Sequence, residues 1–149
     1  MDVTQGKLVI GYRFNIDYKN EKDYYSLVVG SNILGGGTSS KMFLNIREKE
    51  SLCYYIYSSV EKYKGILFIG VGIAFENYDR TVELVKNQIE SIKLGKITSE
   101  ELENSKRVLT NAMKALGDII GAMSDFYFVQ NISKTNSTVE EIIKIYKQC

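Results

Sequence analysis

The residues best suited to chemistry lie in one glycine-rich stretch, "LGGGTSSKMFLNIREKESLCYYI", which runs from Leu34 to Ile56. Three consecutive glycines are followed by hydroxyl side chains and by Lys41. A glycine-rich loop at the start of a helix can bind phosphate through backbone N–H groups, so a nucleotide site is the first hypothesis. The Walker A pattern fails at two positions, because Ser40 replaces its second glycine and Met42 replaces its magnesium-binding hydroxyl. The dinucleotide pattern G-x-G-x-x-G also fails at Ser40, so nucleotide binding is disfavoured.

The simpler interpretation of this stretch is a connection between two helices. Gly35 would end the first helix in the left-handed conformation, and Ser39 or Ser40 would cap the second. The free N–H groups of the second helix could still receive a carbonyl or a carboxylate.

Histidine is absent from the 149 residues. This chain alone therefore cannot form a histidine zinc site, a Ser-His-Asp triad or a Cys-His pair. Its two cysteines, Cys53 and Cys149, do not make a disulfide framework. Cys53 begins an apolar run and is expected to be a small buried side chain rather than a nucleophile.

The net charge of +1 gives no sign of the excess of basic residues that is typical of proteins that bind nucleic acid. The longest uncharged apolar run, residues 66–75, is too short to cross a bilayer, and the N-terminus lacks the pattern of a signal peptide. A cytoplasmic protein without membrane or nucleic-acid partners is expected.

Apolar periodicity divides the chain into strands and helices. The helix at 39–50 should turn Met42, Phe43 and Ile46 inward, and glycines in the strand at 65–75 indicate tight packing or bulges. The helix at 76–95 carries an apolar stripe of Tyr78, Val82, Val85, Ile89 and Ile92. In chain order, the expected elements are a strand at 7–16, helices at 20–34 and 39–50, strands at 52–63 and 65–75, and helices at 76–95, 97–117, 122–132 and 137–148.

Two capping boxes support the later helices, one formed by Thr98 and Glu101 and the other by Thr138 and Glu141. Strands and helices are segregated along the chain, which indicates an α+β fold with an antiparallel sheet and helices packed on one face. No linker or repeat divides the sequence, so residues 1–149 are expected to form a single domain.

The glycine-rich stretch also resembles a known signature. It is similar to L-G-G-G-x-S-S-[RK]-L-F-x-x-[IL]-R-E-K-x-G-L-x-Y, found in the C-terminal half of the insulinase/pitrilysin family of zinc metallopeptidases, the inverted zincins. The flanking sequences extend this resemblance over nearly the whole chain. Ser51 replaces the usual glycine, which makes the turn after the helix less certain, and Met42 replaces a common leucine. The matching positions are Leu34 to Gly37, Ser39, Ser40, Lys41, Phe43, Ile46, Arg47, Glu48, Lys49, Leu52 and Tyr54.

The resemblance implies that this chain is one half of a larger peptidase. Members of the family are built from two related halves that face each other across a chamber. The N-terminal half carries H-x-x-E-H, whose histidines bind zinc with a downstream glutamate. A chain without histidine resembles the other half, which binds no metal. The implied partners are a zinc-bearing half, on the same chain or on a separate subunit, and a peptide substrate.

The resemblance also implies substrate-binding residues. The metal-free half contributes an arginine and a tyrosine that reach toward the substrate carbonyl near the zinc, and these map to Arg47 and Tyr54. Related glycine-rich loops in mitochondrial processing peptidase are implicated in holding substrate, which by analogy places Gly35, Gly36 and Gly37 at the chamber wall.

Two alternatives remain open at the level of sequence. In the first, Arg47 simply pairs with Glu48 or Glu50, and Tyr54 is a core aromatic residue. In the second, the whole chain belongs to a catalytically inactive structural or partner-binding subunit derived from the same family.

Overall fold

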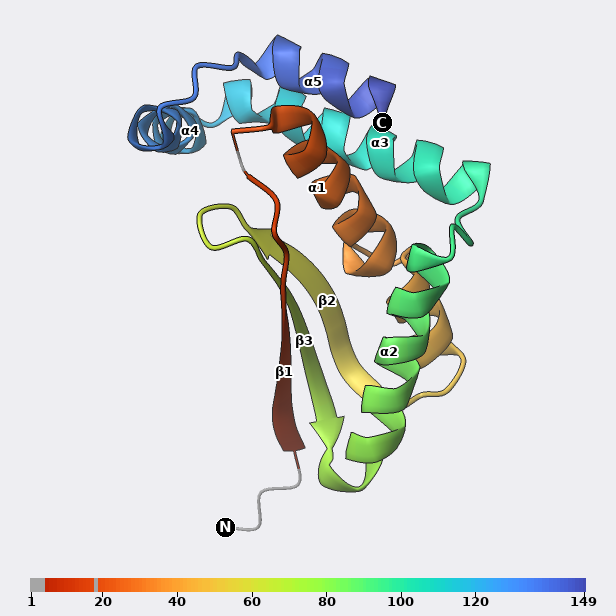
Figure 1. Cartoon of the computed structure of the whole chain (residues 1–149). Coiled ribbons are helices and arrows are strands. Elements are labelled where there is room, and N and C mark those ends of the chain that lie inside the picture. The colour runs from red at the N-terminus through yellow and green to blue at the C-terminus, as the bar shows by residue number, and fades with distance from the viewer. Residues whose placement is uncertain (1–4, 18) are drawn as a thin grey trace.

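The computed structural model describes residues 5–17 and 19–149, and the order of its elements is the one predicted (Figure 1). One strand and one helix precede a short π-helical segment, two more strands and a run of helices. The elements are β1 (Gln5–Arg13), α1 (Glu21–Gly35), the π-helical segment η1 (Phe43–Glu48), β2 (Cys53–Glu61), β3 (Ile66–Ala74), α2 (Tyr78–Lys93), α3 (Ser99–Ala115), α4 (Ile120–Ser133) and α5 (Val139–Gln148).

The three strands form an antiparallel sheet in the order β1-β3-β2. Alternate residues of each strand point to opposite faces, and the inward set packs beneath α1, η1 and α2. Ile69, Val71, Met42, Ile46 and Val85 are fully buried in this core. The structure therefore confirms the predicted α+β fold with an antiparallel sheet and helices on one face.

On the outer face of the sheet, two tyrosines of β2 cover two glycines of β3. The rings of Tyr55 and Tyr57 stack with their centroids 6.2 Å apart. A Cβ atom at Gly72 would clash with the ring of Tyr55, and one at Gly70 would clash with the ring of Tyr57. The predicted tight packing at these glycines is therefore confirmed.

A second core lies where α5 crosses α1. Tyr25 and Val29 of α1 are buried against Ile142 and Tyr146 of α5, with α3 packed alongside. Figure 1 shows α3 and α5 side by side, with α1 between them and the sheet. Within the described residues, no helix is both long and apolar enough to cross a membrane.

Both predicted capping boxes are present. The Thr98 hydroxyl accepts a hydrogen bond from the Glu101 N–H, and the Glu101 carboxylate accepts one from the Thr98 N–H. Thr138 and Glu141 repeat this arrangement at the start of α5. These boxes satisfy N–H groups that have no partner inside the helix.

The apolar stripe predicted for α2 differs at two positions. Leu84 rather than Val82 packs against the core, and the first residue of the stripe also differs. Val85 and Ile89 are buried as expected, but Tyr78 is exposed and Thr81 takes the inward position. The reason is that a 3-10 turn at Phe75–Asn77 precedes α2, so Tyr78 lies at the very start of the helix.

The glycine-rich connection also differs from the prediction. Gly35 is the last residue of α1, and positive φ angles occur among the described glycines only at Gly65 and Gly95. The expected left-handed cap at Gly35 is therefore wrong. Gly35 is instead required by close packing, because a Cβ atom there would meet the Met42 side chain and would lie 2.7 Å from the backbone nitrogen of Ser58.

The helix expected at 39–50 is not a regular α-helix. It is π-helical over Phe43–Glu48, with a hydrogen bond from the Lys49 N–H to the Leu44 carbonyl at 3.1 Å. Of the two candidate caps, Ser40 accepts a hydrogen bond from the Phe43 N–H at 3.4 Å. π-Helical turns are frequent at functional sites, and this one carries Arg47.

Candidate substrate-binding site

Arg47 lies near the end of η1 with its side chain partly exposed. Its guanidinium carbon is 4.6 Å from the centroid of the Phe43 ring, an arrangement that favours one orientation of the cation. Its Nη1 is also 3.8 Å from the Glu48 carboxylate, while Glu50 pairs with Arg80 instead. The alternative pairing with Glu48 is therefore present, but an ion pair of this length between exposed groups is weak and leaves Arg47 able to bind a ligand.

Tyr54 occupies a β-bulge at the start of β2. Cys53 lies opposite Ile73 and Tyr55 lies opposite Gly72, so Tyr54 is an extra residue without a partner on β3. In a regular strand Tyr54 would share the inward face of Ile56, two residues later. The bulge turns it outward, and it is 54% exposed. The alternative of a core aromatic residue at Tyr54 is therefore wrong.

The structure brings Arg47 and the start of β2 together. η1 packs against β2, and the positive charge of Arg47 acts on the thiol of Cys53, which immediately precedes Tyr54. Burial raises the pKa of the Cys53 thiol, and the charge of Arg47 lowers it by a smaller amount. Cys53 is half-buried against the core, so its thiol stays protonated at neutral pH and is a poor nucleophile, as expected from the sequence.

The turn that joins η1 to β2 depends on one left-handed residue. Ser51 has φ of 54°, the conformation that glycine adopts most easily. Its N–H donates to the Arg47 carbonyl at 3.1 Å, which closes the turn. Glycine, the usual residue of the signature at this position, adopts this conformation without strain, and this chain forms the turn with serine.

Replacing Ser51 with glycine is expected to stabilise the chain by up to about 1 kcal/mol, because a side chain in the left-handed region costs about that much. Urea unfolding at equilibrium measures the change. Ser59→Gly is the matched control, since Ser59 is an exposed residue of β2 with ordinary backbone angles. The free energy of unfolding of that control should fall by roughly 0.5–1 kcal/mol, because glycine is unfavourable inside a strand. Equal destabilisation by the two changes would contradict the role given to Ser51.

The three glycines of the loop are not equivalent. Gly35 is buried between α1 and β2, whereas Gly36 and Gly37 are exposed. A Cβ atom at Gly37 would meet nothing within 4 Å. Among the described residues, no hydrogen bond links these glycines to the side chains of Arg47 or Tyr54. Gly37 is thus open to a ligand, whereas a Cβ atom at the exposed Gly36 would clash with Asn32. Gly35 has a packing role that the sequence did not reveal.

Three of the polar side chains after the glycines, Ser39, Ser40 and Lys41, are already engaged. Lys41 forms an ion pair with Glu101 at 2.8 Å, and Asn104 donates to the Ser39 hydroxyl at 2.6 Å. Burial raises the pKa of Glu101, but hydrogen bonds from Lys41 and from the Thr98 N–H outweigh it, and the pKa falls below its usual value. Lys41 therefore fixes the loop to α3 and is not available for phosphate, in agreement with the failed Walker A pattern.

This contact was missed from the sequence because Lys41 and Glu101 are far apart along the chain. Within the part of the chain that the structure describes, no group of three or more His, Cys, Asp or Glu residues could hold a metal ion.

Comparisons with known proteins agree with the motif. A sequence profile of the peptidase M16 inactive domain matches residues 1–109. The chain is 34% identical over 142 residues to a probable inactive metalloprotease, YmfF, of Bacillus subtilis, and 32% identical over 114 residues to the uncharacterized zinc protease YmxG of the same organism. These alignments cover 95% and 75% of this chain but only 33% and 27% of the relatives. The chain thus spans about a third of the length of these curated relatives.

Solved structures show the same architecture. A conserved protein from Enterococcus faecalis superposes with a TM-score of 0.80 at 30% identity, covering 98% of this chain and 37% of that one. A peptidase M16 inactive domain from Pseudomonas fluorescens superposes with a TM-score of 0.68 at 26% identity, and the match covers 99% of this chain and 39% of that one. With the profile match and the shared motif, these similarities show that the chain belongs to the peptidase M16 inactive-domain family, within the insulinase-type zinc metallopeptidases.

Proposed function

We propose that this chain is the non-catalytic, substrate-binding half of an insulinase-type zinc peptidase. In this proposal Arg47 and Tyr54 donate hydrogen bonds to the carbonyl oxygen of a bound peptide, opposite a zinc site carried by another domain. The observation that supports it is the bulge at Tyr54, which leaves this phenol exposed at the start of β2, the strand against which the Arg47-bearing segment η1 packs.

The chemistry of these two side chains suits peptide hydrolysis. Attack on the scissile carbonyl places negative charge on its oxygen, and fixed donors stabilise that charge. A guanidinium keeps its proton at any working pH and presents several N–H groups, and a phenol adds a neutral donor. The Phe43 ring restricts the orientation of the Arg47 guanidinium and the bulge leaves Tyr54 exposed, which supports this role.

Other steps of the reaction require groups that this chain does not supply. Its sequence contains no histidine, so the zinc ligands of an H-x-x-E-H motif must come from elsewhere. The zinc, when bound to that other half, would activate water and polarise the carbonyl. This half would contribute binding and orientation.

The substrate is expected to lie along the exposed edge of β2. Among the described strands, β2 pairs only with β3, so its other edge is free to bind an extended peptide by strand addition. The exposed residues Gly36 and Gly37 would allow the peptide backbone a close approach at the adjacent loop.

A second candidate function is a structural or partner-binding subunit without catalytic activity. It is favoured by the description of the Bacillus subtilis relative as a probable inactive metalloprotease. Kinetics of Arg47 and Tyr54 variants in the assembled protein separate the two functions. If the chain binds substrate, these variants should turn over peptide more slowly while the chain stays folded. If the chain is only structural or partner-binding, the variants should leave turnover unchanged.

A further inference from the structure

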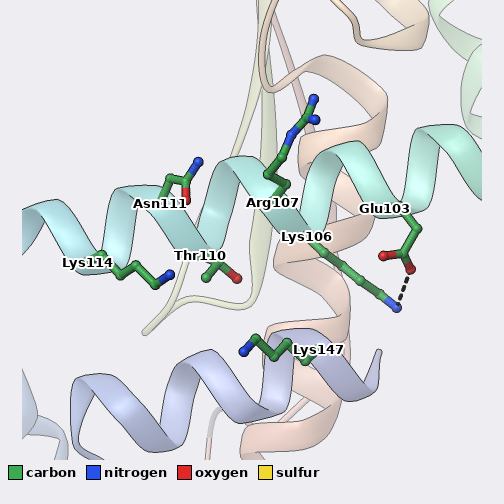
Figure 2. Close-up of a pocket in the computed structure, with 7 residues that line it drawn as sticks. All are labelled: Glu103, Lys106, Arg107, Thr110, Asn111, Lys114 and Lys147. Atoms are coloured by element: carbon green, nitrogen blue, oxygen red, sulfur yellow. Dashed lines mark hydrogen bonds and ion pairs between the residues drawn. The ribbon is translucent and has the colours of Figure 1, made fainter.

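A second polar surface lies between α3 and α5, on helices that carry neither Arg47 nor Tyr54. A pocket of about 280 Å³ is lined there by Lys106, Arg107, Thr110 and Lys114 of α3 and by Lys147 of α5, with Glu103 at its rim (Figure 2). This volume is several times the roughly 30 Å³ taken by one water molecule. The pocket therefore has room for a ligand larger than a single water.

The side chains that line this pocket carry an excess of positive charge. Four cationic side chains line it with a single carboxylate, although the whole chain has a net charge of only +1. Glu103 pairs with Lys106 at 3.1 Å. Lys114 and Lys147 have no ion pair with any residue that the structure describes. Two ammonium groups thus face the same space without a counter-charge.

The residues of α3 that face α5 follow helical spacing. Lys106, Thr110 and Lys114 are each four residues apart, so they lie on one side of the helix. In Figure 2 Lys147 extends from α5 toward Thr110 and Lys114 of α3. Lys114, Lys147 and Thr110 therefore belong to one site.

Thr110 lines the same pocket, and as a residue it is only 7% exposed. Its hydroxyl forms no hydrogen bond with any described residue. It is not one of the fully enclosed polar atoms without a partner, a description that among the described residues fits only the Thr81 hydroxyl. The Thr110 hydroxyl is therefore open to the pocket and can donate to an acceptor there.

From these observations we propose that the pocket between α3 and α5 binds a multiply charged oxyanion of the phosphate or polycarboxylate class. Lys114 and Lys147 supply the positive charge, and the Thr110 hydroxyl donates a hydrogen bond to one of the oxygens. The two ammonium groups can only donate and the Thr110 hydroxyl can also donate, which suits a ligand that presents only acceptors. Lys106 is held by Glu103 and contributes through its charge.

Titration calorimetry at constant ionic strength tests this site, with pyrophosphate and citrate as the two probes. Saturable binding of either probe at one site is expected, and the tighter one identifies the class. Lys147→Gln should weaken that binding about tenfold or more, as expected for loss of a hydrogen bond between charged groups. Thr110→Val, which keeps the shape of the side chain, should weaken it severalfold.

Lys144→Gln is the matched control, because it makes the same change of charge on the same helix outside the pocket. It should alter binding less than twofold. Failure of both probes to bind at millimolar concentration would overturn the proposal. Equal weakening by Lys144→Gln and Lys147→Gln would do the same, since it would indicate general attraction rather than a site. Neither result bears on Arg47 and Tyr54, which lie on other elements.

Discussion

Arg47→Ala is expected to lower kcat/KM of the assembled peptidase about a hundredfold while this chain stays folded. Removal of one preorganised donor to a developing oxyanion typically costs 10²–10³ in rate. The side chain is partly exposed, and its ion pair with Glu48 is 3.8 Å long, so its loss should cost little stability. Steady-state kinetics on a fluorogenic peptide, with thermal unfolding of the same sample, measures both effects.

The matched control for Arg47 is Arg80→Ala. Arg80 is also exposed and pairs with Glu50 and Glu83, but it lies on α2 and not on η1 or β2. This control should keep full activity. Tyr54→Phe keeps the ring and removes only the hydroxyl, so it should reduce kcat about tenfold or more, whereas Tyr55→Phe on the outer face should have little effect. Full activity of Arg47→Ala and Tyr54→Phe in an active parent would contradict the proposed role.

Gly35→Ala is expected to destabilise the chain by about 2 kcal/mol. The new Cβ atom would meet Met42 and would lie 2.7 Å from the Ser58 nitrogen, so α1 would have to move away from β2. Overpacking of this kind costs about 1–3 kcal/mol, and the better helix propensity of alanine offsets less than 1 kcal/mol of it. In a chain of this size Tm should fall by about 4–8 °C.

Gly37→Ala is the comparison for Gly35. Its position is open and its φ is not in the left-handed region, so its stability should change by less than about 0.5 kcal/mol. Chemical denaturation of both variants gives the two values. If Gly35→Ala and Gly37→Ala were similarly stable, the close contact of Gly35 with β2 would not be the reason for glycine at position 35.

Local patterns in the sequence predicted the elements well. The alternation in β1 and the two capping boxes each depend on residues close together in the chain, and the structure confirms them. The segregated order of strands and helices was enough for the fold class. The ends of the elements were less accurate, because strand ends are set by pairing with β3 rather than by composition.

The candidate site was harder to predict from the sequence, because its geometry depends on contacts between residues that are far apart in the chain. The run "CYYIY" gives no sign that the alternation breaks at Tyr54, since the bulge is defined only by the register with β3. Nothing near Lys41 indicates that Glu101 will hold it. The positions of Arg47 and Tyr54 came from the family resemblance, and the π-helical turn that carries Arg47 was not predicted.

Reconstitution tests the central claim most directly. A polypeptide of the same protein that carries H-x-x-E-H would be assayed for zinc content and peptide cleavage alone, after mixing with this chain, and beside this chain alone. We expect this chain alone to bind no zinc and to cleave nothing, and chelator-sensitive cleavage to appear only when both are present. Full cleavage by the H-x-x-E-H polypeptide alone, or chelator-sensitive cleavage by this chain alone, would contradict its role as the metal-free, substrate-binding half.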